Sequence, residues 1–227
     1  MSYMFQNCKS LDNIDLTQFN TSKTINMSNM FDSCEKLQKL ELNNFETTNV
    51  QNMSHMFTNC KTLTSLNLSY FNTSNVTNMS SMFKNCINLN YLEINSFNTS
   101  LVTDMSEMFE NCQDLDNLNI SNFDVKNVVN MLGMFDNCTS LKSINLSNFA
   151  TDNLIEASYF FHDCLELTHM DLRKFNTLKL NDCVDFFQNK SSDVYLIYNK
   201  TIFTLEIPKD WNATDISQYD DYPLFIL

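Results

Sequence analysis

Apolar residues recur along this chain at intervals of 26 residues, and the polar residues between them keep the same order each time. Each interval contains a Met–Phe–Cys run, then spaced leucines, then a phenylalanine among Asn, Ser and Thr. The cysteines mark the register: Cys8, Cys34, Cys60, Cys86, Cys112, Cys138 and Cys164. Seven copies fill positions 1–182 without an insertion. A fixed period of this length is typical of a solenoid, in which each copy packs only against its neighbours.

Two elements are predicted within each copy, as residues 76–97 illustrate. Leu89, Leu92 and Ile94 have the L-x-x-L-x-L spacing of leucine-rich-repeat strands, in which Leu92 and Ile94 point inward. Before them, apolar residues recur at spacings of three and four: Val76, Met79, Met82, Phe83 and Cys86. This spacing predicts one face of a short helix. We therefore expect an α/β solenoid of the leucine-rich-repeat type, with seven 26-residue repeats that each contain a short strand and a short helix.

Asparagine and threonine columns predict the turns between these elements. Asn78 precedes the expected helix, where its side chain can accept a hydrogen bond from an unpaired backbone N–H. Asn85 follows the helix, and asparagine enters the left-handed conformation of such an end more readily than other non-glycine residues. A threonine column, interrupted by Val125, is expected to bond the turn backbone through its hydroxyl groups. Its members are Thr21, Thr47, Thr73, Thr99, Thr151 and Thr177.

The period ends after residue 182, which divides the chain into two expected parts. Residues 1–182 form the solenoid, whose first copy is truncated at its N-terminal side, and residues 183–227 form a C-terminal cap. The segment VYLIYNKTIFTLEIP alternates apolar and polar residues about Asn199–Lys200, which predicts a β-hairpin over the last coil. The first copy starts inside its expected helix. We therefore expect the chain to be the C-terminal part of a longer repeat protein, or to start at an internal methionine.

The unit FNTSNVTNMSSMFKNCINLNYLEINSF resembles the repeat of the BspA-like leucine-rich-repeat surface proteins. The matching pattern is F-x-T-S-x-V-T-x-M-S-x-M-F-x-x-C-x-x-L-x-x-L-x-L-x-x-F, and it covers positions 1–182. The resemblance implies a surface-exposed adhesion or interaction protein, and hence a location at the cell surface or outside the cell. A cytoplasmic location is the alternative, which reduced cysteines would suit equally well.

Charge and hydropathy exclude several kinds of partner. The formal net charge is −13 at pH 7, so we expect no nucleic-acid partner and no adhesion to an anionic membrane, because like charges repel. The sequence has no run of about 18 apolar residues, so we expect no membrane insertion of this chain. A signal peptide is not recognisable either, but an upstream segment would carry it. The sequence leaves the oligomeric state open.

Side chains with catalytic or metal-binding potential form no recognisable set. Parallel stacking would point the cysteine side chains of the column in the same direction, which disfavours disulfides, and the sequence has no C-x-x-C pair for a metal. Cys183 lies off the column and is expected to be the most exposed thiol. His55, His162 and His169 fall at different phases of the repeat and are not expected to meet a set of carboxylates. We therefore expect no enzyme activity, no metal and no cofactor.

The outward positions of the strands form the candidate ligand-binding face. Its expected residues are Asp15, Glu41, Asn67, Tyr91, Glu93, Asn119, Asn145 and Asp171. Solenoids bind partners on extended faces, and acidic and amide groups suit a hydrogen-bonded protein or glycan ligand. A face that is only solvated is the alternative. The sequence thus predicts a non-catalytic interaction or adhesion module, with an intracellular scaffold for protein–protein interaction as the second possibility.

Overall fold

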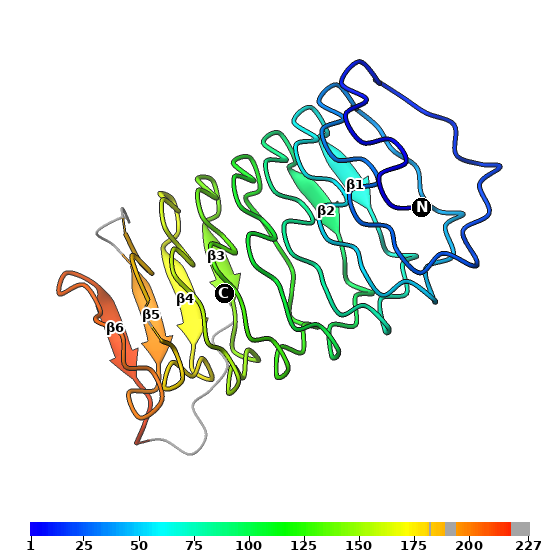
Figure 1. The fold of residues 1–227 in the computed structure, drawn as a ribbon. Helices are drawn as coiled ribbons and strands as arrows, with labels where there is room; N and C mark the ends of the chain where they lie inside the picture. The colour runs from blue at the N-terminus through cyan, green and yellow to red at the C-terminus, as the bar shows by residue number, and fades with distance from the viewer. Residues whose placement is uncertain (182, 189–193, 219–227) are drawn as a thin grey trace.

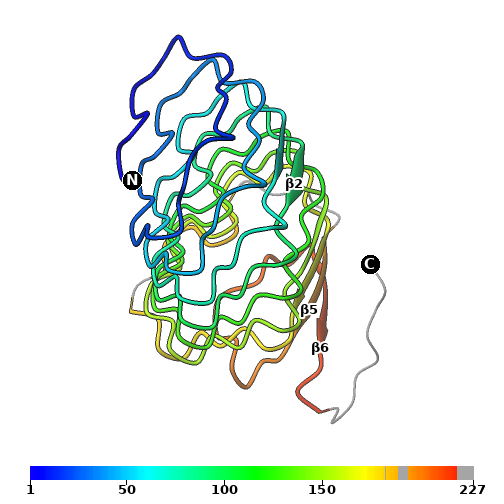
Figure 2. The same ribbon diagram turned by 90° about the vertical axis from the view of Figure 1, so that its right-hand side faces the viewer.

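The chain folds into a solenoid whose coils stack along one axis (Figure 1). The computed structural model describes residues 1–181, 183–188 and 194–218. Short strands lie along one side of the stack in both views (Figures 1 and 2). They are β1 (Ser65–Asn67), β2 (Tyr91–Glu93), β3 (Ser143–Asn145), β4 (His169–Leu172), β5 (Tyr195–Tyr198) and β6 (Asn212–Asp215). One sheet contains β1 and β2, and a second contains β3 to β6 in order.

The register of the strands repeats the period of the sequence. Leu66 of β1 pairs with Leu92 of β2, and Ile144 of β3 pairs with Met170 of β4, each 26 residues further along the chain. Both pairs are parallel, as stacked coils of one handedness require. The predicted solenoid with parallel strands is therefore confirmed.

Phenylalanine rings and thiols form continuous columns in the core. Five rings stack in succession with centroid distances of 5.5–5.8 Å: Phe31, Phe57, Phe83, Phe109 and Phe135. Burying a ring of this size contributes about 1.5–3 kcal/mol to folding. The thiols also link coils, because Cys86 Sγ donates to the Phe57 carbonyl of the preceding coil at 3.2 Å. The apolar columns of the sequence are thus buried as predicted.

The described residues contain no helix, so the prediction of a short helix in each repeat is wrong. In residues 53–60, every second backbone N–H bonds the next coil, as His55 N–H does to Ser80 O at 2.9 Å. A helix would use these donors within its own segment. His55 (φ 56°) and Asn59 (φ 59°) are also left-handed, which interrupts helical geometry. Accordingly, none of these residues belongs to a helix that could cross a membrane.

The prediction of seven strand-and-helix repeats is not supported either. Within residues 1–182, strands form at four of the seven expected places. In the first two coils, Gln38 N–H bonds Asp12 O, but Leu16 O accepts from the Asn44 side-chain amide. Beside β1, where a strand does form, Ser96 Oγ also donates to the equivalent carbonyl of Leu68, but Leu68 N–H bonds Glu93 O, and the first two coils lack an equivalent bond from Leu16 N–H.

The predicted β-hairpin about Asn199–Lys200 is wrong, because residues 199–208 form no strand and β5 pairs in parallel with β6, which lies further along the chain. The chain turns after β5 and returns in the same direction, so that β6 extends the sheet that begins at β3. His169 of β4 lies opposite Tyr195 of β5, again 26 residues further on. The strand period therefore continues into the region expected to be a cap. Residues 189–193 and 219–227 of that region lie outside the described residues, and the division at residue 182 stays a prediction.

Asparagine side chains form a ladder along the stack. Asn85 Nδ2 donates to Asn59 Oδ1 at 2.8 Å, and Asn111 Nδ2 donates to Asn85 Oδ1 at 2.8 Å. Asn137 continues this asparagine ladder by donating to Asn111. Asn85 has a φ of 59°, so its left-handed conformation is as predicted although no helix ends there.

Threonine hydroxyls bond the backbone of the neighbouring coil. Thr99 Oγ1 donates to Asp124 O at 2.9 Å and accepts from Asp124 N–H at 2.8 Å. Where Val125 interrupts the column, Ala150 N–H bonds Asn148 O within its own coil at 2.9 Å. The hydroxyl groups therefore join neighbouring coils.

We expect Asn85→Ala to lower the free energy of unfolding by about 1–2 kcal/mol. Alanine would occupy a left-handed position and would remove both ladder bonds of Asn85. Urea denaturation measures the change. Asn88→Ala, at an exposed position nearby, is the matched control and should change stability by less than about 0.5 kcal/mol. Equal effects of the two substitutions would contradict the role of the ladder.

Exchanges in the threonine column should act in opposite directions. Thr99→Val leaves Asp124 N–H and C=O without their hydroxyl partner and should cost about 1–3 kcal/mol. Val125→Thr supplies the missing hydroxyl and should stabilise the chain by about 1 kcal/mol. Thermal unfolding measures whether Thr99→Val lowers and Val125→Thr raises the stability of the chain. A destabilised Val125→Thr variant would contradict the prediction that a hydroxyl group at position 125 joins the coils as it does at position 99.

Candidate functional site

The structure exposes six of the eight residues expected on the ligand-binding face. They are Asp15, Glu41, Asn67, Tyr91, Asn119 and Asn145. Glu93 is half-buried and accepts a hydrogen bond from the Tyr91 hydroxyl at 3.3 Å. The register places Glu93 opposite Asn67 in the neighbouring strand, so these groups lie side by side on the sheet. That the face binds a ligand stays a prediction.

Several polar residues of this face also hold the local backbone. Asn67 Oδ1 accepts from Ser69 N–H at 2.9 Å, two residues on, and Asn145 Oδ1 accepts from Ser147 N–H at 3.0 Å. Asp15 accepts in the same way from Thr17, whose N–H and hydroxyl lower the pKa of the Asp15 carboxyl. Part of the polar character of the face is therefore explained by turn formation.

Asp171 does not belong to an open face, and its prediction as a ligand-binding residue is corrected by its burial. The residue is only 4% exposed, and its carboxylate lies against the Arg173 guanidinium. Arg173 Nε donates to both carboxylate oxygens at 2.9 Å. An arginine two residues away on the same side of the strand neutralises the acid, which is the reason for its low exposure.

A shallow hollow of about 280 Å³ lies on the face between two coils. Glu41 and Asn67 line it together with Tyr70, which is 65% exposed. Leu40, Leu42 and Asn43 complete the lining. The hollow thus combines a carboxylate, an amide and an exposed phenol ring.

A further exposed aromatic residue on the strand side was missed in the sequence. Tyr195 is 52% exposed, and its ring stacks on His169 with a centroid distance of 4.9 Å. Tyr195 follows His169 by 26 residues, so extending the period beyond residue 182 would have found it.

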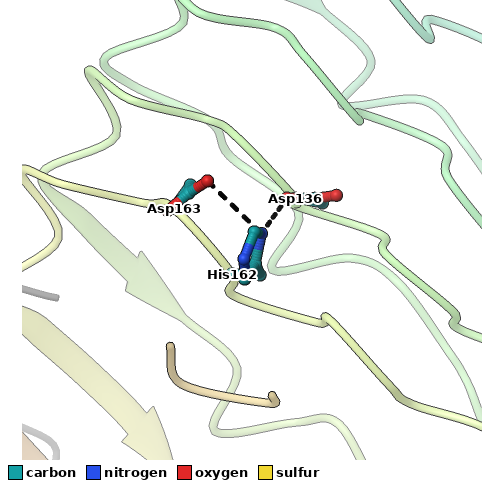
Figure 3. A group of neighbouring side chains, drawn as sticks. All are labelled: Asp136, His162 and Asp163. Carbon is teal, nitrogen blue, oxygen red and sulfur yellow. Dashed lines mark hydrogen bonds and ion pairs between the residues drawn. The ribbon is translucent and has the colours of Figure 1, made fainter. Parts of the chain in front are cut away.

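One histidine does meet carboxylates, contrary to the prediction from repeat phase. His162 Nδ1 lies 2.8 Å from Asp136 Oδ1 and 3.5 Å from Asp163 Oδ2 (Figure 3). Burial lowers the pKa of His162, but the hydrogen bond and charge of Asp136 and the charge of Asp163 outweigh it and raise the pKa. Asp136 precedes His162 by 26 residues, so the period alone places them on adjacent coils.

The cysteines are free thiols. Those of the column from Cys34 to Cys164 are buried, and burial raises the pKa of Cys86 to about 12. Cys183, which was expected to be the most exposed thiol, is half-buried, as is Cys8, and burial with the charge of Glu156 raises the pKa of Cys183 to about 12. Cys86 and Cys183 therefore lack the low pKa of catalytic cysteines.

A family profile described as "Mycoplasma protein of unknown function, DUF285" matches residues 1–92 and 82–199 of the chain. A solved leucine-rich repeat protein from Bacteroides ovatus is 16% identical, with a TM-score of 0.37. The similarity covers 86% of this chain and 57% of that protein, so the chain spans less than two thirds of that protein's length. No curated protein matches the chain.

Alkylation should distinguish the thiols of the folded protein. At pH 8 we expect iodoacetamide to modify Cys8 first and Cys183 more slowly, while Cys86 stays unmodified until the chain unfolds. Peptide mass spectrometry over a time course measures each rate, and a urea-denatured sample in which all eight thiols react is the control. Early modification of Cys86 in the folded protein would contradict the packing of the column.

Proposed function

The chain belongs to the family of Mycoplasma proteins of unknown function, DUF285, and we propose that it is a non-catalytic recognition module of the leucine-rich-repeat type. Family membership confirms the resemblance to BspA-like repeats. The binding surface is the strand face, which consists of Asp15, Glu41, Asn67, Tyr70, Tyr91, Glu93, Asn119 and Asn145. We place this module on the cell surface or outside the cell because of that family, with a cytoplasmic scaffold as the alternative.

Exposed tyrosines among carboxylates and amides are the observation that carries this proposal. Tyr70 and Tyr91 are 65% and 53% exposed, although rings of this size are normally half-buried or more in a folded chain. Tyrosine is enriched in binding sites because it offers a large contact area with few rotatable bonds. Its hydroxyl group also donates and accepts hydrogen bonds.

The charge of the chain indicates the chemistry of the partner. The net charge is −13, and Glu41 and Glu93 add carboxylates beside the two tyrosines. Such a face attracts lysine and arginine and speeds their association by electrostatic steering. We therefore favour a protein partner with a basic, partly aromatic surface over a glycan.

Selection from a phage-displayed peptide library and binding to a glycan array test this proposal. We expect the whole chain to select peptides rich in lysine, arginine and aromatic residues, whose binding weakens as salt increases. Tyr70→Ala should weaken the selected peptides by about 30-fold, which corresponds to about 2 kcal/mol at a central contact. Glu41→Lys should weaken them as well, through charge reversal.

Glu46→Lys is the matched control, because Glu46 is an exposed glutamate of the same coil outside the strand face. It should leave peptide binding nearly unchanged. Peptide binding that is unchanged by Tyr70→Ala and Glu41→Lys but lost with Glu46→Lys would refute the assignment of the binding surface to the strand face. Glycan binding that depends on Tyr70, without peptide binding, would replace the protein partner by a glycan.

A further inference from the structure

The asparagine ladder changes its chemistry at the coil that contains residues 157–164. Asn85, Asn111 and Asn137 each donate from Nδ2 to the Oδ1 of the asparagine 26 residues earlier. The next position in the column is Asp163. An ionised aspartate only accepts hydrogen bonds, so it cannot donate to Asn137 Oδ1 as an asparagine would. The donation from one asparagine to the next therefore ends at Asn137.

The neighbouring column brings a nitrogen ligand to the same place. His162 precedes Asp163, and Asp136 lies one coil before His162. One ligand atom from each of these three residues can be chosen so that all lie within 4.8 Å of one another. Figure 3 shows the His162 ring between the two carboxylates. The three side chains are half-buried, which leaves them open to solvent on one side.

Carboxylates elsewhere on this surface have a different counter-ion. Lys84, which lies in the same column as Asp136, binds Glu107 and Glu110 at 2.8 Å each. Lysine supplies a positive charge but is no metal ligand when it is protonated. At His162 the column instead offers an imidazole, which binds either a proton or a metal ion.

We propose that Asp136, His162 and Asp163 bind a divalent first-row transition metal of the Zn²⁺ class. The metal would take His162 Nδ1 and one oxygen from each carboxylate, and water would complete its coordination. An imidazole with two carboxylates suits Zn²⁺ or Co²⁺, whereas Ca²⁺ and Mg²⁺ prefer oxygen ligands only. The two positive charges would balance the carboxylates of Asp136 and Asp163.

Calorimetric titration of the whole chain with Zn²⁺ tests the proposal. We expect one site with micromolar affinity. His162→Ala and Asp136→Asn should each weaken binding by about 100-fold or more, at or beyond the upper end of what loss of a supporting partner costs at metal sites. His55→Ala is the matched control, because His55 is a half-buried histidine in an earlier coil, and it should bind Zn²⁺ like the unaltered chain.

Asp163→Asn keeps the test independent of folding defects. Asparagine at this position restores the donor that the ladder uses in the other coils, so this variant should be at least as stable as the unaltered chain while it binds Zn²⁺ about 10-fold or more weakly. The visible spectrum of the Co²⁺ form should lack the thiolate charge-transfer band that cysteine ligands produce. Equal Zn²⁺ affinity of His162→Ala and the unaltered chain, a thiolate band, or no binding at millimolar Zn²⁺ would each overturn the proposal.

Discussion

Backbone hydrogen bonds between successive coils set the geometry of the whole stack. In the segment from residue 53 to residue 60, alternate N–H groups bond carbonyls 25 residues later, and the intervening N–H groups close turns within the coil. Buried backbone groups must be paired, so an insertion in one coil would leave a row of donors without acceptors. This constraint explains why seven copies of the sequence keep their length without exception.

Side chains also form hydrogen bonds from one coil to the next. Thr99 bonds Asp124, Cys86 bonds Phe57, and Asn85 bonds Asn59, in each case across one coil boundary. Because the backbone bonds fix the distance between coils, the rings of one column lie at stacking distance from one another, as Phe57 and Phe83 do. Stability is then a sum of interactions between neighbouring coils, and each polar column contributes to the same interfaces as the core.

The sequence predicted what depends on the period and missed what depends on the path of the backbone. Apolar columns, inward leucines and the left-handed Asn85 follow from residue type and spacing. Spacings of three and four are also produced by successive turns, so they could not distinguish a helix from the turns that the chain forms. His55 is left-handed in a column that also contains Asn29 and Gly133, the single glycine of the chain, and this glycine was the signal that the sequence analysis did not use.

The same distinction applies to the candidate sites. The outward strand residues were predicted from alternation, but the burial of Asp171 depends on the conformation of Arg173. Alternation about Asn199–Lys200 predicted a second strand over residues that form none, and the parallel partner of β5 is β6, further along the chain. His162 and Asp136 are separated by one full period and therefore lie in the same column. Comparing each histidine with the carboxylates of its own column, instead of with the other histidines, would have paired them.

The inter-coil bonds of residues 53–60 all point one way, because each coil donates N–H groups to the coil that follows it and accepts from the coil before it. Peptide dipoles that share a direction add, as they do along an α-helix. The column of segments equivalent to residues 53–60 therefore contributes a dipole along the axis of the stack, with its negative end at the coil of Tyr3, while bonds such as Thr77 N–H to Gln51 O oppose it. Its sign with respect to chain direction is opposite to that of an α-helix.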